Sequence, residues 1–333
     1  HAGGVVRERA NRVVVEILSS ERPADRPVAA ETRKGIMARP TLTRALVGLH
    51  GAGRSDTYGV ALLDVAQDHL LWLLSDLGHF DDGSLIFKGG TSLRKFRLGG
   101  NGRFSTDLDF VAPDDDTVLA VCAAINGASV SGFQFSLQGT RGDGRHWTLQ
   151  VRHPILGQPD VEASVEFARR PLTVAPERLD FVAVPVHRAY EIKLPTVPVI
   201  SQPEACAEKL ARYRRIALVR DVYDLAQLAA RSMDEVLVRR LWVLKVWSDV
   251  VDDSRGEKPL DPADVLAPKK EKDFAPEAIG RLTQPVDIPA WERRVRERFG
   301  FLANLDATER RWAACDPRHR AEIDEARSAL ADR

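Results

Sequence analysis

The chain has little cysteine. Its three cysteines, Cys122, Cys206 and Cys315, lie far apart and form no CxxC pair. An odd number at such wide spacing argues against a disulfide framework and against a structural zinc site, and it favours a reducing compartment. We therefore expect all three to be small buried apolar residues.

Charge of one sign is also lacking, because 48 Lys and Arg balance 48 Asp and Glu. A net charge of zero gives no global field that would attract nucleic acid, so any basic surface must be local. Apolar runs are shorter than the roughly 18 residues that a membrane helix needs, and we expect no signal peptide. These absences predict a cytoplasmic protein with no membrane partner.

Length and apolar content are what the chain does provide, with 333 residues of which 44% are hydrophobic. This is enough for two domains of ordinary size. We predict an N-terminal extension over residues 1–41, whose first four residues resemble a cloning tag, an α/β core over 42–200, and a helical domain over 201–333. Apolar alternation predicts strands at 85–87, 107–110, 133–137, 147–151, 161–167, 181–186 and 190–194, and helical spacing predicts helices at 204–219 and from 220.

The most informative stretch is LIFKGGTSLRKFRLGGNGRFSTDLDF, residues 85–110. A short apolar run ends at Lys88, and Gly89 and Gly90 lead into a segment with the spacing of a helix. A glycine turn at a helix N-terminus offers backbone N–H groups and partial positive charge, which suit a phosphate. A pair of glycines alone is more often only a turn.

The end of the same stretch is acidic. In the sequence Asp107, Leu108, Asp109, Phe110 the alternation predicts a strand with both carboxylates on one face. Two like charges side by side repel each other, and a divalent cation neutralises such a pair. We predict Mg²⁺ bridging nucleotide phosphates, with Mn²⁺ able to substitute. By contrast, the acids Asp114 to Asp116 are predicted to favour a helix N-terminus rather than to bind metal.

The turn and the acid pair, in this order and spacing, resemble the signature of the nucleotidyltransferase superfamily. More narrowly, FKGGTSLRK followed by RFSTDLDF, and EKLARYRR followed by RDVYDL, resemble the AbiEii toxin family, which includes the MenT toxins of toxin–antitoxin pairs. The resemblance covers residues 42–230. It implies a polymerase-beta-like nucleotidyltransferase fold of the α/β (α+β) class, with a small mixed sheet and a helical C-terminal half.

The resemblance also implies the roles of several residues. Asp107 and Asp109 would hold Mg²⁺ against the triphosphate of an NTP, and Lys209 and Asp221 carry over as further active-site residues. A lysine there would stabilise charge on the leaving pyrophosphate, whereas the plain alternative is an ion pair between consecutive helices. The residues expected to bind the nucleotide are Lys88, Gly89, Gly90, Ser92, Lys95 and Ser105, with no choice made between the two lysines.

A third carboxylate often shares the metals in such sites. The strand predicted at 161–167 places Glu162, Ser164 and Glu166 on one face. The position where relatives often carry aspartate falls on Ser164. Either Glu162 or Glu166 supplies the third acid, or the site works with two, which we favour slightly.

The family implies a toxin that adds nucleotides to the 3′ acceptor end of tRNA and is restrained by a cognate antitoxin. The arginines that follow Lys209 suit an RNA backbone, or else form a solvated helix face. Two alternatives remain, because the same motifs occur in enzymes that modify protein hydroxyls, as in AMPylation, or small molecules such as aminoglycosides, and a catalytically weak nucleotide-binding module would also retain them.

Overall fold

The computed structural model describes residues 41–331, except for 53–54, 140–141, 158–159, 255–257, 275–281 and 283–284. Residues 1–40, nearly all of the predicted N-terminal extension, therefore lie outside the described residues. The chain forms two compact units that interleave along the sequence. The described residues of the first unit are 41–85, 106–169 and 183–197, and those of the second are 86–105, 170–182 and 198–331.

The first unit contains a mixed sheet with the strand order β3-β4-β5-β6-β2. Strands β3 to β6 pair antiparallel in sequence order, whereas β2 pairs with β6 in parallel. A small mixed sheet is what the sequence predicts. The strands are β2 (Asp107–Val111), β3 (Ser129–Val130), β4 (Phe133–Gly139), β5 (His146–Arg152) and β6 (Val161–Ala168).

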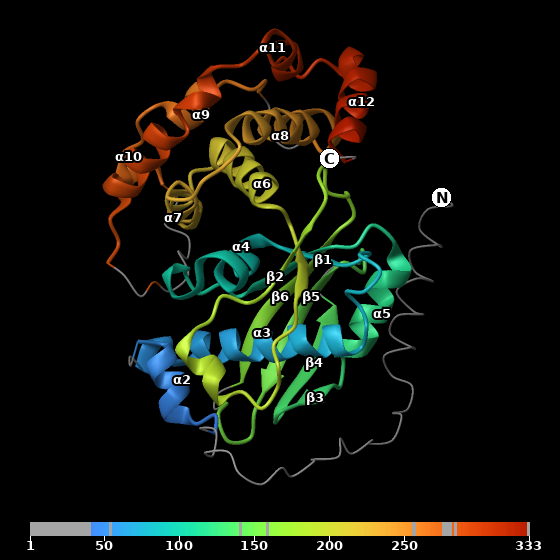
Figure 1. Ribbon diagram of the computed structural model, residues 1–333, viewed down its shortest axis with the longest axis vertical. Helices are drawn as coiled ribbons and strands as arrows, with labels where there is room; N and C mark the ends of the chain where they lie inside the picture. Colours follow the sequence, from blue (N-terminus) through green and yellow to red (C-terminus); the bar gives the residue numbers. More distant parts are fainter. Residues whose placement is uncertain are drawn as a thin grey trace. The chain divides into compact units, whose positions relative to one another are not determined.

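Helices cover this sheet. Helix α3 (Tyr58–Asp76) lies across it in Figure 1 and buries most of its side chains. The unit also holds α2 (Arg44–His50) and α5 (Asp115–Ile125). Asp114 caps α5 by accepting a hydrogen bond from the Thr117 N–H at 2.6 Å, which confirms that this acid serves a helix start. In the described part of the chain, no helix combines the length and the apolar character needed to cross a membrane.

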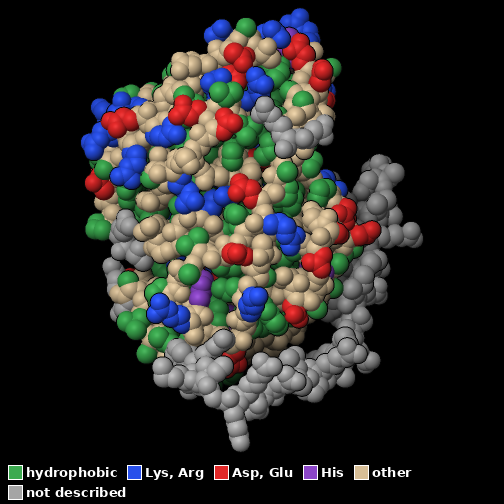
Figure 2. Space-filling view, in the orientation of Figure 1, with side chains coloured by type: hydrophobic (Ala, Val, Ile, Leu, Met, Phe, Trp, Pro, Cys, Tyr) green, Lys and Arg blue, Asp and Glu red, His purple; other side chains and the backbone are tan. Residues whose placement is uncertain are grey.

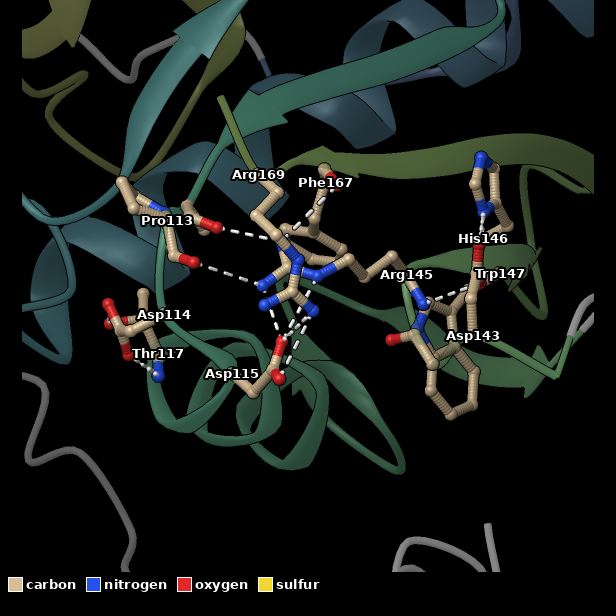
Figure 3. A network of polar contacts seen from close by, with 12 residues as sticks. Pro113, Asp114, Asp115, Thr117, Asp143, Arg145, His146, Trp147, Phe167 and Arg169 are labelled. Carbon is tan, nitrogen blue, oxygen red and sulfur yellow. Dashed lines mark hydrogen bonds and ion pairs between the residues drawn. The ribbon is translucent and has the colours of Figure 1, made fainter. Parts of the chain in front are cut away.

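A buried arginine fastens the ends of β2 and β6 to the start of α5 (Figure 3). The Nη1 atom of Arg145 donates to the carbonyl oxygens of Ala112 at 2.7 Å and of Phe167 at 3.4 Å. Its Nε atom donates to Asp115 Oδ1 at 3.1 Å, and this hydrogen bond holds the pKa of the Asp115 carboxyl below its usual value. One side chain thus joins the two parallel strands at their carboxyl ends.

We expect Arg145→Ala to lower the free energy of unfolding by about 1–3 kcal/mol for each buried carbonyl that loses its donor. Arg169→Ala is the matched control, because Arg169 contacts the same Asp115 at 2.9 Å but is exposed. An exposed pair of this kind contributes less than about 1 kcal/mol. Urea denaturation of both variants measures the difference, and equal losses would show that only the contact with Asp115 matters.

The second unit joins short strands to the helical half of the chain. Strand β1 (Ile86–Lys88) pairs in parallel with β8 (Val197–Val199) through Phe87 and Val199, and β7 (Glu177–Leu179) lies beside β8. The helices confirm the predicted helical C-terminal half. They are α6 (Gln202–Arg215), α7 (Val219–Leu228), α8 (Glu235–Trp247), α9 (Ala263–Leu266), α10 (Ile288–Arg298), α11 (Ala307–Ala313) and α12 (Arg320–Ala331). The short helix α4 (Gly89–Leu93), earlier in the chain, belongs to the same unit.

The strands predicted at 181–186 and 190–194 are wrong. The Phe181 ring packs on Phe96 with centroids 4.5 Å apart, and Pro185 opens a 3-10 turn instead of continuing a ladder. The Tyr190 hydroxyl donates to buried Asp68 at 2.6 Å. The alternation that suggested strands is therefore produced by side chains that anchor an irregular segment.

Candidate functional site

The first unit carries the predicted acid pair. Asp107 and Asp109 are half-buried on one face of β2, while Leu108 and Phe110 on the other face are fully buried. This confirms the alternation expected from the sequence. The Thr106 hydroxyl donates to Asp107 Oδ1 at 3.3 Å.

Strand β6 adds polar groups next to the pair. The parallel register places Ser164 beside Asp107 and Glu166 beside Asp109. The Ser164 hydroxyl donates to Glu166 Oε1 at 3.3 Å. Glu162 is exposed and precedes the part of β6 that pairs with β2. Of the two candidate glutamates, Glu166 is therefore the one in register with the acid pair.

The donor set fits a magnesium ion that the substrate helps to hold. Among the described residues, no three side chains of His, Cys, Asp or Glu are grouped so that they could bind a metal ion by themselves. Mg²⁺ is ordinarily held by one or two carboxylates together with substrate phosphates and water, rather than by an all-protein cage. Two carboxylates on one strand face, Asp107 and Asp109, satisfy that requirement.

The second unit carries the glycine turn. Lys88 ends β1 and Gly89 begins α4 with a φ of +80°, a left-handed conformation that suits glycine. The Ser92 hydroxyl donates to the Gly89 carbonyl at 3.0 Å, so its hydrogen is used within the turn. The strand, turn and helix start expected from the sequence are all present.

Glycine is also needed at position 90, because of the side chains that lie close to its backbone. A Cβ atom at this position would lie 2.5 Å from Nη2 of Arg103 and 3.1 Å from Oγ of Ser105. The backbone of the turn thus packs directly against these two side chains, and both are buried. Lys95 is also buried, and its carbonyl accepts a hydrogen bond from the Val182 N–H at 2.8 Å.

Lys209 and Asp221 meet in a buried chain of alternating charges. The Lys209 ammonium donates to Asp221 Oδ1 at 3.3 Å and to Asp224 Oδ2 at 2.6 Å. Arg212 forms an ion pair with Asp221, and Arg103 forms two hydrogen bonds of 3.1 Å with Asp224. The order is Arg212, Asp221, Lys209, Asp224, Arg103, with three positive and two negative groups.

The cations keep both acids ionised. Burial by itself raises the pKa of Asp221, but Lys209 and Arg212 outweigh it, so the pKa lies below the usual value. Burial acts in the same way on Asp224, where Arg103 and Lys209 lower the pKa. We infer that neither carboxyl is poised to give up a proton near neutral pH.

A second ion chain begins at the glycine turn. The Lys88 ammonium donates to Glu208 Oε1 at 2.8 Å, and Lys245 on α8 lies 3.4 Å from the same oxygen. Lys245 also lies 2.7 Å from Glu204 Oε1. Burial raises the pKa of Glu208, yet the two lysines outweigh it and lower that pKa to about 2.

Glu208 should make the stability depend on acid pH. Its pKa is depressed in the folded protein, so as pH falls the unfolded chain takes up the proton first. Its contribution is complete above pH 4.5 and is lost as the pH falls toward about 2. We expect Glu208→Gln to flatten the dependence of the unfolding free energy on pH by up to about 1.4 kcal/mol per pH unit in this window. Urea denaturation at several pH values measures this pH dependence, with the exposed Glu297→Gln as the control. If the unfolding free energy of Glu208→Gln varied with pH in parallel with wild type, the expected contribution of Glu208 would be refuted.

Two members of the charge chain are not among the site residues predicted from the sequence, although Asp224 is expected there as a structural partner. Arg103 lies two residues before Ser105 within RFSTDLDF, and Asp224 lies one helical turn after Asp221. The i, i+3 spacing of two acids on an amphipathic helix was the available signal for Asp224. The sequence offers no comparable signal for Arg103, because its partner is 121 positions away.

The arginines that follow Lys209 are largely compensated. Arg214 donates to Asp264 at 3.1 Å, Arg215 lies 3.3 Å from Asp249, and Arg239 donates to Glu309 at 2.7 Å. On the face shown in Figure 2, basic and acidic side chains are interspersed over the helical part. Arg214, Arg215 and Arg239 are therefore each compensated by an acid.

Comparisons with known proteins identify the family of the chain. The family model described as nucleotidyl transferase AbiEii toxin, type IV toxin–antitoxin system, matches residues 72–318. The chain is similar to the solved structure of MenT4, nucleotidyltransferase toxin Rv2826c from Mycobacterium tuberculosis H37Rv. The identity is 63%, the TM-score is 0.84, and the match covers 87% of this chain and 99% of that chain. JHP933 from Helicobacter pylori matches with 15% identity and a TM-score of 0.41, over 72% of this chain and 92% of its own. No curated protein matches the chain.

Proposed function

The chain belongs to the AbiEii family of nucleotidyltransferase toxins, and we propose that it transfers nucleotides from an NTP to the 3′ acceptor end of tRNA in a Mg²⁺-dependent reaction. A type IV toxin–antitoxin family implies a cognate antitoxin. The observation that carries the proposal is the half-buried face of β2 on which both Asp107 and Asp109 lie. Blocking the acceptor end would prevent aminoacylation and so stop translation.

Asp107 and Asp109 would hold the metal ion. Mg²⁺, when bound, supplies charge neutralisation for an in-line displacement and lowers the pKa of the attacking hydroxyl. The apolar face of β2 and the Arg145 contacts keep the strand fixed, so the two carboxylates need no reorganisation when the substrate arrives.

Groups of the second unit are assigned to the triphosphate. The N–H groups of the glycine turn would bind phosphate oxygens, and Lys209 would stabilise the charge that develops on pyrophosphate as it leaves. Lys88 is better exposed for such a role than Lys95, with 19% of its side chain accessible, so we assign the contact to Lys88. Its pairing with Glu208 would direct its ammonium group.

The acceptor is the part of the proposal that rests on the family resemblance alone. Because the arginines after Lys209 are paired with acids, the charge distribution gives no independent support for an RNA surface. For that specific reason a hydroxyl group of a protein is retained as the second candidate acceptor. The chemistry assigned to Asp107, Asp109 and Lys209 is the same for both acceptors.

The decisive assay incubates the protein with Mg²⁺, total tRNA and each α-labelled NTP in turn. We expect label on tRNA from wild type, and a loss of at least about 10²-fold in Asp107→Ala. Asp116→Asn, on the exposed first turn of α5, is a matched control that should keep its activity. Chelation of the metal ion should abolish transfer by wild type.

Three outcomes separate the candidates. Label on tRNA that disappears in Asp107→Ala supports tRNA as the acceptor. Label that appears instead on a protein moves the assignment to the second candidate acceptor. Full activity in Asp107→Ala would refute the metal-binding role of the acid pair.

A second experiment tests the number of acids that bind the metal. Because the described residues include no cluster of three ligands, Glu162→Gln and Glu166→Gln should each raise the half-saturating Mg²⁺ concentration less than the loss of a direct carboxylate ligand does. Asp109→Asn should raise it by more than about tenfold. The effect of each substitution is measured in two ways: as nucleotide transfer at varied Mg²⁺ concentration, and as metal binding by electron paramagnetic resonance of Mn²⁺. A rise in Glu166→Gln as large as that in Asp109→Asn, together with a changed Mn²⁺ spectrum, would identify Glu166 as a third ligand.

A further inference from the structure

Asp224 binds two cations, Lys209 and Arg103, that are far apart in the sequence of the second unit. Its carboxylate on α7 accepts a hydrogen bond of 2.6 Å from Lys209 on α6 and two of 3.1 Å from Arg103. Only 1% of Asp224 is accessible to solvent. A buried carboxylate with this many charge-assisted donors is tightly fixed, and it fixes its donors in turn.

Arg103 continues the connection to the glycine turn. Its Nη2 atom lies so close to Gly90 that a Cβ there would be 2.5 Å away. The guanidinium therefore rests against the backbone of the turn on one side and holds Asp224 on the other. An unbroken set of contacts runs from Gly90 through Arg103 and Asp224 to the Lys209 ammonium.

Asp221 does not provide the same connection. Its oxygen lies 3.3 Å from Lys209, farther than the 2.6 Å contact made by Asp224. Its stronger partner is Arg212, whose Nε donates to it at 2.7 Å and whose Nη2 also contacts it. No hydrogen bond of Asp221 to Arg103 or to the turn occurs among the contacts of the described residues.

We propose that Asp224 is a positioning residue for nucleotidyl transfer, because its carboxylate holds the Lys209 ammonium at a fixed place relative to the glycine turn. The inference rests on the proposed function, which assigns both Lys209 and the turn to the triphosphate. Asp224 itself touches no substrate and transfers no proton. Misplacing a charged group by about 1 Å costs an enzyme on the order of 10²-fold in rate.

The choice of substitutions is limited because the charged groups are buried. Removing one partner of a buried pair leaves an uncompensated charge and destabilises the protein, so alanine is unsuitable. Asp224→Asn keeps the size and one oxygen acceptor. Lys209→Met keeps the length of the side chain, and the double variant has the same net charge in the cluster as wild type.

The test is a double-mutant cycle measured by nucleotide transfer. Asp224→Asn should lower kcat about 10²-fold with a smaller effect on the KM for NTP. In the Lys209→Met background the same substitution should lower kcat by less than about threefold, because a residue that acts through Lys209 has nothing left to position. Equal factors in both backgrounds would overturn the proposal and leave Asp224 with a structural role.

A second variant guards against misfolding. Arg103→Lys keeps the positive charge but loses the two parallel hydrogen bonds to Asp224. It should lower kcat in the wild-type background and change it little in Lys209→Met, with Gly100→Ala as a control at a glycine whose added Cβ meets nothing within 4 Å. Arg103→Lys with wild-type kcat, or with the same loss in both backgrounds, would overturn the proposal.

Failure of the proposed function would be visible in wild type itself, as an absence of labelled tRNA. The same proteins would then be titrated by calorimetry with α,β-methylene NTP analogues. Weaker binding caused by Asp224→Asn in the wild-type background alone supports the positioning role. Equal weakening in both backgrounds, or no binding by wild type, overturns it.

Discussion

The buried chain of alternating charges is the constraint on which the second unit depends. Arg103, Lys209 and Arg212 come from two separate stretches of sequence, and Asp221 and Asp224 lie on one turn of α7. Lys209, Arg103, Asp221 and Asp224 are buried, and the opposite charges beside each of them offset the cost of taking it out of water. These ion pairs therefore tie the segment after the glycine turn, α6 and α7 to one another.

In the first unit the electrostatic constraint is the repulsion between two like charges. Two carboxylates on one face of β2 repel each other, and the strand tolerates them because Leu108 and Phe110 anchor its other face. Arg145 adds a fastening at the carboxyl ends of β2 and β6. The strand that carries the acids is thus held by hydrophobic burial and by the hydrogen bonds from Arg145.

Much of this could be predicted from the sequence because the signals are local. The alternation in Asp107 to Phe110 and in Val161 to Phe167 gives the faces of β2 and β6 directly, and the glycine pair marks the turn. The AbiEii resemblance, which the family model and the similarity to MenT4 bear out, supplied the fold.

Long-range pairing was beyond the reach of local signals. Arg103 and Asp224 are 121 positions apart, so the contact that completes the charge chain leaves no periodic pattern. The parallel register that sets Glu166 beside Asp109 is decided by strand pairing, which a sequence pattern alone does not fix. The strands predicted at 181–186 and 190–194 are wrong because the local pattern there does not come from strand pairing. Phe181 and Tyr190 contact other side chains and are not part of a strand.

A composition with no net charge does not exclude local groups of like charge. The face of β2 has two negative groups close together, and the buried chain has one more positive group than negative. Charge counted over the whole chain excludes a strong global field but says nothing about such sites. Conversely, a local excess of basic residues in the sequence need not produce a positive surface in the folded protein. Arg214 and Arg239, for example, are each paired with an acid.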